Sequence, residues 1–156
     1  MIDRRQALAF AAAAGWLPFN RAVAREAGSR PALTSYVNPF IGTDGTGHTF
    51  PGPSMPFGMV QPGPDNADHG WEFTSGYQYR APQILGFSQN RASGTGIPEL
   101  GDLLLQPSQT LREAYASAYD KPSEQARPGF YAVSLTDNQV RVELTAGVRS
   151  AFHRYT

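Results

Sequence analysis

The stretch of residues 37–65, VNPFIGTDGTGHTFPGPSMPFGMVQPGPD, limits what this chain can fold into more than any other part of it. Glycine allows positive φ angles and close backbone approach, whereas proline lacks the N–H group that a central strand must donate. The stretch holds too much of both residues to form a helix. We therefore expect an ordered loop between two short apolar runs, residues 40–41 and 57–60.

The composition favours β structure and excludes several kinds of function. Thirteen basic and thirteen acidic residues give zero net charge, which argues against nucleic acid or an anionic membrane surface as the main partner. The chain has no cysteine, so it forms no disulfide, thiolate metal site or thiol nucleophile. Sixteen glycines, thirteen prolines and 12% aromatic residues fit an all-β domain better than a helical bundle.

The N-terminus has the pattern of an export signal. A twin arginine, Arg4 and Arg5, precedes a mildly apolar, alanine-rich run over residues 7–19, and Ala22-Val23-Ala24 fits a signal-peptidase site. We expect a twin-arginine signal peptide over residues 1–24, a linker over 25–35, and a periplasmic or secreted product. The alternative is an amphipathic helix that packs on the domain. The apolar run is too short to span a membrane.

Residues 36–156 predict an antiparallel β-sandwich. Residues 130–136 and 140–145 alternate apolar and polar side chains on either side of Asp137-Asn138, which suits a hairpin turn. Residues 71–79 alternate in the same way and predict a half-buried strand. Further strands are expected at 36–41, 57–61, 101–106 and 148–155, with 101–106 buried on both faces. The last strand has no closing signal, so we expect an incomplete domain.

Two residues are candidates for ligand contact. His48, in the first glycine loop, could present a hydrogen-bonding or cationic group, or could simply cap the loop backbone. The ring of Trp71 could stack on the apolar face of a sugar, or could fill the core. Asp44-Gly45-Thr46-Gly47 is similar to a calcium-binding loop in composition only, because it lacks evenly spaced carboxylates.

Ordered blocks along the whole segment 36–156 resemble the N-terminal domain of glycoside hydrolase family 92, the exo-acting α-mannosidases. The blocks are VNPFIGT (37–43), GHTFPG (47–52), PFGMVQ (56–61), SGYQY (75–79), ILGFS (84–88), LGDLLLQP (100–107), EQARPGFYAV (124–133) and VELTAGVRSAFHRYT (142–156). The family often has histidine after the GFS block, where this chain has Gln89.

The resemblance implies a fold, an activity and a site. Family members join an N-terminal β-sandwich to a C-terminal (α/α)6 barrel, depend on calcium, and remove terminal α-linked mannose from N-glycans or mannans with inversion. The barrel supplies the acid, the base and the calcium ligands, so no catalytic residue or metal ligand is assigned to this chain. The sandwich contributes loops that contact the terminal sugar, and by resemblance Gly47, His48 and Trp71 face it.

Three hypotheses remain open from the sequence. The chain is the sugar-contacting N-terminal part of an exported α-mannosidase, inactive without its barrel. Alternatively, it is a stand-alone carbohydrate-binding module that uses Trp71 as a platform. A third reading is a non-functional fragment whose open sheet edge leads to aggregation.

Overall fold

The computed structural model describes residues 31–67, 70–91, 103–111 and 114–156. Residues Ala32–Thr156 form one compact unit. The expected signal peptide, residues 1–24, lies outside the described residues, as does the expected linker up to residue 30. Within the described ranges, no helix is long and apolar enough to cross a membrane.

The fold is all-β and antiparallel, as the sequence predicts. Each strand pair of the described ranges is antiparallel. Their helical elements are short 3-10 helices: η2 (Leu33–Tyr36), η3 (Trp71–Phe73) and η4 (Lys121–Ser123). Irregular loops connect these short elements over much of the N-terminal half, where glycine and proline are frequent.

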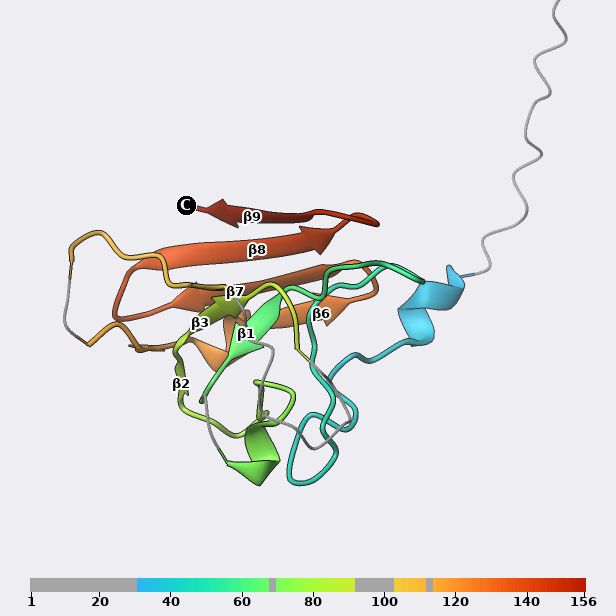
Figure 1. Cartoon of the computed structure of the whole chain (residues 1–156), viewed down its shortest axis with the longest axis horizontal. Coiled ribbons are helices and arrows are strands. Elements are labelled where there is room, and N and C mark those ends of the chain that lie inside the picture. The colour runs from blue at the N-terminus through green and yellow to red at the C-terminus, as the bar shows by residue number, and fades with distance from the viewer. Residues whose placement is uncertain (1–30, 68–69, 92–102, 112–113) are drawn as a thin grey trace, which may run out of the picture. The chain divides into compact units, whose positions relative to one another are not determined.

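A four-stranded meander forms the larger layer. Its strands are β6 (Gln125–Arg127), β7 (Phe130–Leu135), β8 (Val140–Ala146) and β9 (Ala151–Tyr155), which lie side by side in chain order (Figure 1). The register places Val133 opposite Val142 and Leu144 opposite His153. The period-two pattern of the sequence is confirmed here, because one face of β7 and β8 is buried and the other is partly exposed.

Two small sheets pack on the buried face of the meander. One joins β1 (Gly63–Asp65), β3 (Gly86–Ser88) and β4 (Leu104–Leu105), and the other joins β2 (Gln83–Ile84) to β5 (Ser117–Ala118). Ile84 and Phe87 from the small sheets form a single core cluster with meander side chains. The meander contributes Tyr131, Val133, Leu135, Val140, Val142 and Leu144. The core thus lies between two layers of sheet.

A buried polar cluster ties the loop before β2 to the start of the meander. The hydroxyls of Tyr77 and Tyr131 donate to Glu124 Oε1 over 2.8 and 2.7 Å, and Lys121 Nζ lies 2.6 Å from Glu124 Oε2. The Lys121 ammonium also lies 3.7 Å above the centre of the Tyr79 ring. Burial, and secondarily the negative charge of Glu124, raises the pKa of both Tyr77 and Tyr131. Each charge in this cluster therefore has a partner, which a buried ion pair requires.

Three of the expected strands are wrong. Residues 36–41 contain the end of η2 and a turn, and residues 57–61 contain Phe57 with φ +57, an angle that no strand adopts. The strand forms two residues later, at β1. Residues 71–79 are not a strand either, because they begin with η3 and contain Gly76 at φ +83.

The expected burial of residues 101–106 is also wrong for the part described. Leu104 and Leu105 do form a strand, β4, but they are 36% and 37% exposed. Both side chains are exposed because β4 pairs with β3 on one side only and therefore lies at the edge of its sheet. Residues 101 and 102 lie outside the described residues.

Candidate functional site

His48 sits in a loop whose backbone is fixed on both sides. It adopts φ +53, an angle that is costly for a residue with a side chain, and it is only 8% exposed. The Thr49 N–H donates to the Gly42 carbonyl over 3.3 Å, and the Ser75 hydroxyl donates to the Thr49 carbonyl over 2.9 Å. These bonds hold the strained backbone in place and keep the imidazole in one direction.

Gly47 is the position in this loop that admits no side chain. A Cβ atom there would lie 2.0 Å from the Gly42 carbonyl oxygen, which is backbone and cannot move aside. Gly47 itself is exposed, and its N–H donates to the Asp44 carbonyl over 3.2 Å. The glycine therefore permits the close chain crossing that brings His48 to the neighbouring segment.

Trp71 reaches the same place from a different segment. It opens η3 directly after Gly70, which has φ +100, and its side chain is 60% exposed. The centre of its ring lies 4.9 Å from that of His48, with the ring planes at 78°, so the two rings meet edge to face. The structure thus brings together the three residues that the sequence analysis names, and it leaves Trp71 outside the core.

Thr74 belongs to this cluster and was missed by the sequence analysis. It is fully buried, and its Oγ1 lies 2.5 Å from His48 Nδ1. The expected strand placed Thr74 on a polar face away from Trp71. Helical spacing, which puts Thr74 one turn after Trp71, would have pointed to it.

Two buried amide side chains hold the loops around the cluster. Gln78 Nε2 donates to the Gly45 carbonyl over 2.9 Å, and the Gln78 N–H donates to Asn66 Oδ1 over 2.7 Å. Asn66 Nδ2 in turn donates to the Gln83 carbonyl over 2.6 Å. These bonds replace the ladder hydrogen bonds that a strand would have supplied.

The glycine loop shows no cation-binding arrangement. Asp44 Oδ1 accepts the Gly45 N–H over 3.0 Å, and Asp44 Oδ2 lies 2.6 Å from Arg80 Nε. The carboxylate therefore serves the turn and an exposed ion pair. In the ranges that the structure describes, no three His, Cys, Asp or Glu side chains lie close enough together to hold a metal ion. The described residues do not fit a calcium site.

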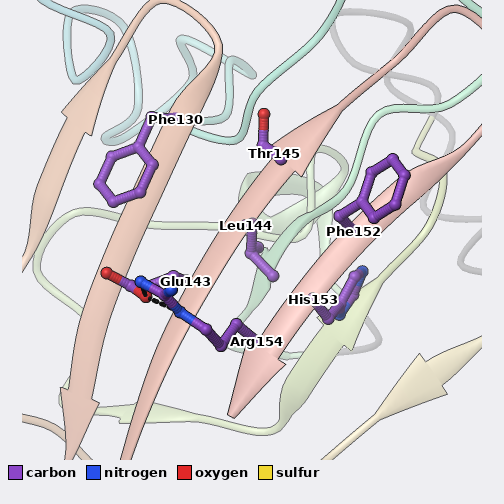
Figure 2. Close-up of a pocket in the computed structure, with 7 residues that line it drawn as sticks. All are labelled: Phe130, Glu143, Leu144, Thr145, Phe152, His153 and Arg154. Carbon is purple, nitrogen blue, oxygen red and sulfur yellow. Dashed lines mark hydrogen bonds and ion pairs between the residues drawn. The ribbon is translucent and has the colours of Figure 1, made fainter. Parts of the chain in front are cut away.

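A separate hollow of about 330 Å³ lies on the meander and contains none of the three candidate residues. Figure 2 shows Phe130, Thr145 and Phe152 across β7, β8 and β9, with the ion pair of Glu143 and Arg154 beside them. Phe152 is 63% exposed and Arg154 is exposed, so this is an open surface on one face of the sheet.

The described structure is thus an all-β domain in which an exposed tryptophan lies edge to face against a buried histidine. Residues 36–156 match the glycosyl hydrolase family 92 N-terminal domain. The chain belongs to this family. The match covers the whole of the described β fold and both segments of the His48–Trp71 cluster.

Solved structures and a curated protein agree with this assignment. A family GH92 α-mannosidase from Bacteroides thetaiotaomicron, solved in complex with mannoimidazole, is 42% identical, with a TM-score of 0.77 over 81% of this chain. A GH92 inverting mannosidase from the same organism is 20% identical with a TM-score of 0.62 over 82% of the chain, and shows the fold alone. A protein from Arthroderma benhamiae, described as an uncharacterized secreted glycosidase, is 32% identical and covers 77% of the chain.

These relatives are much longer. The chain spans 18% of each of the two Bacteroides mannosidases and 17% of the Arthroderma protein.

Proposed function

We propose that this chain is the sugar-contacting N-terminal portion of an exported, calcium-dependent α-mannosidase that hydrolyses terminal α-linked mannose of N-glycans or mannans. The observation that carries the proposal is its 42% identity to an α-mannosidase whose solved structure holds mannoimidazole. The secreted description of the Arthroderma glycosidase supports export.

The geometry of the cluster gives each candidate residue a role in this proposal. The exposed face of Trp71 stacks on the apolar C–H face of the sugar ring. His48, which lies edge to face against Trp71, lines the same side of the proposed sugar site. Gly47 leaves the loop surface open, since a side chain there would displace the loop.

The chemical step belongs to a C-terminal barrel in this proposal. An inverting glycosidase needs an acid and a base on opposite sides of the scissile bond, roughly 6.5–9.5 Å apart, with room for a water molecule. The barrel supplies this pair together with the calcium ligands. We therefore expect the 156-residue chain by itself to hydrolyse no aryl α-mannoside, even with calcium added.

A chimera tests the proposal directly. Residues 36–156 replace the corresponding segment of the Bacteroides α-mannosidase to which they are 42% identical. Hydrolysis of an aryl α-mannoside is then measured for the chimera and for its Trp71→Ala and His48→Ala variants. Phe152→Ala is the matched control, because Phe152 is an aromatic residue with nearly the same exposure as Trp71, 63% against 60%.

We expect an active chimera in which Trp71→Ala and His48→Ala each lower kcat/KM by roughly tenfold, about 1.4 kcal/mol, while the control changes little. Unchanged kcat and KM in both variants would remove the cluster from the site. Tight binding of methyl α-mannoside by the 156-residue chain without turnover would instead favour the carbohydrate-binding module.

Export has its own test. Residues 1–24 are fused to a reporter that is active only after export in a folded state, and Arg4 and Arg5 are both replaced by lysine. We expect the reporter in the periplasm with the natural sequence and in the cytoplasm with the variant. Equal export of both would contradict a twin-arginine route.

A further inference from the structure

We infer that Gln78 is a positioning residue for Trp71. Its side-chain amide joins the glycine loop (residues 42–52) to the 3-10 helix η3, and so fixes where the exposed indole stands beside that loop. The bonds that support this lie within the described part of the chain. The consequence for a bound sugar rests on the function proposed above.

Trp71 receives little support from the core. Its side chain is 60% exposed, and it opens a 3-10 helix of only three residues. So short a helix has few bonds of its own, such as the one from the Phe73 N–H to the Gly70 carbonyl over 3.1 Å. Apart from the edge-to-face contact with His48, the place of the indole therefore depends on how η3 is attached to other segments.

The amide of Gln78 makes such an attachment. Gln78 is 6% exposed, and its Nε2 donates to the Glu72 carbonyl in η3 and to the Gly45 carbonyl in the glycine loop, the latter over 2.9 Å. An amide nitrogen carries two hydrogens, so each carbonyl takes one of them. Carbonyl oxygens can only accept, which places the nitrogen rather than the oxygen of the amide between them. One planar group thus sets the spacing between the residue after Trp71 and a point three residues before His48.

Other bonds hold the glycine loop on the segment that carries Gln78. The Ser75 hydroxyl donates to the Thr49 carbonyl over 2.9 Å. The Tyr79 N–H donates to the Thr43 carbonyl over 2.8 Å. These bonds fix the loop along residues 75–79, and the Gln78 amide extends this attachment into η3 itself.

The two hydrogens of the amide explain why glutamine suits this position. Methionine has a similar length and volume but no hydrogen to donate, so it would deprive both carbonyls of this partner. Glutamate would turn negative oxygen atoms towards two carbonyl oxygens. Without the bridge, η3 and the glycine loop can shift against each other, and a sugar would meet an indole that has no fixed place. Gln78 thus acts on the ligand through Trp71.

Gln106 offers a matched control in the same chain. Its Nε2 also donates to two backbone carbonyls, that of Ile84 over 3.2 Å and that of Tyr115 over 2.8 Å. Neither carbonyl belongs to η3 or to the glycine loop. Gln106→Met therefore removes the same kind of bridge as Gln78→Met at another place, and controls for a general loss of stability.

The mobility of the indole tests the role of Gln78 directly. Trp16→Phe leaves Trp71 as the one tryptophan of the 156-residue chain. Time-resolved fluorescence anisotropy then separates the motion of the ring from the slower tumbling of the molecule. In this background we expect Gln78→Met to increase the fast loss of anisotropy and Gln106→Met to leave it unchanged. No increase in Gln78→Met, or an equal increase in both variants, would overturn the inference.

The natural chain supplies a second test, which holds even if Gln78→Met fails to fold. Both Nε2 hydrogens of Gln78 are bonded and its side chain is buried, whereas Gln125 is exposed. The side-chain amide hydrogens of Gln78, followed by NMR, should therefore exchange with solvent much more slowly than those of Gln125. Equally fast exchange of the two side chains would show that the bridge is absent.

Kinetics of the chimera separate this inference from the proposed function. Gln78→Met should raise KM about three- to tenfold with little change in kcat, because bound substrate and transition state lose the same stacking contact. Gln106→Met should leave KM unchanged. If Trp71→Ala lowers kcat/KM but Gln78→Met does not raise KM, the proposed site stands and the positioning role of Gln78 is overturned. If Trp71→Ala has no effect, the proposed function of the cluster is overturned, and with it the role of Gln78 towards a sugar.

Discussion

Gly76 lies where a buried ion pair leaves no room for a side chain. Asp65 Oδ1 is 2.9 Å from Arg91 Nε, and both side chains are buried, 1% and 8% exposed. Burial raises the pKa of Asp65, and the adjacent Arg91 guanidinium partly opposes that rise. A Cβ atom on Gly76 would lie 1.9 Å from the same Asp65 oxygen. The glycine therefore does more than permit φ +83, because it also lets the ion pair close.

Replacement of Gly76 by alanine should destabilise the domain by about 3–5 kcal/mol, since the ion pair must separate while both charges stay buried. Gly129→Ala is the matched control: Gly129 has a nearly identical φ, +80, but open space around its Cβ position. It should cost only the backbone strain, about 1–2 kcal/mol. Urea unfolding of both variants measures the difference, and equal losses would show that strain alone acts at Gly76.

At the scale of elements, a side-chain contact joins β9 to the residue that follows β3. Gln89 follows β3 (Gly86–Ser88), at the position where the family often has histidine, and its side chain contacts His153 of β9. Tyr155, also on β9, completes the bond at the second ring nitrogen.

This contact predicts how stability depends on pH. Burial lowers the pKa of His153 in the folded state below the ordinary value of about 6.5. The unfolded chain then binds the proton more readily, so the stabilisation is complete above the ordinary value and is lost as pH falls through the folded-state pKa. Thermal unfolding from about pH 8 to pH 5 should show this loss in the natural chain, and His153→Gln should remove that part of it. Parallel curves for the two proteins would contradict the prediction.

The sequence predicts the meander well because each of its central strands has one buried and one partly exposed face. Val133 and Val142 follow the period-two rule and pair in register. The turn between these strands differs in detail. Asp137 and Asn138 lie in the expected turn, but the next residue, Gln139, is the one that adopts a positive φ, at +51. The side chains of Asp137 and Asn138 instead bond the Ala118 N–H and the Pro107 carbonyl.

The N-terminal half could not be predicted in the same way because its polar residues are buried. Thr74 and Gln78 read as the solvent face of a strand, yet each is 6% exposed or less. The alternation of apolar and polar residues does not predict the hydrogen bonds of these buried side chains, because the bonds join segments far apart in the chain. His48 and Trp71 were candidates from their residue types, and the family resemblance added Gly47, whereas Thr74 becomes visible only once the 3-10 turn of η3 is known.

At the scale of the whole molecule, the proposed calcium dependence concerns the parts that longer relatives have beyond the length of this chain. The chain spans 18% of the length of the Bacteroides mannosidase that supplies the rest of the chimera. The described ranges hold no group of three His, Cys, Asp or Glu side chains suited to a metal ion. The core of the described fold lies between two layers of sheet, and we propose that calcium serves catalysis in the full-length enzyme.

Removal of calcium should accordingly have two different effects. With a chelator such as EGTA, the thermal midpoint of the 156-residue chain should stay unchanged, because the described residues include no group of side chains suited to bind a metal ion whose loss would destabilise the fold. The chimera under the same conditions should lose hydrolysis of the aryl α-mannoside and recover it when excess calcium, but not magnesium, is added, since a site built for calcium suits a larger ion with more oxygen ligands. A fall in the midpoint of the chain itself would reveal a metal site among its own residues. Chimera activity that survives exhaustive chelation would contradict the proposed calcium dependence.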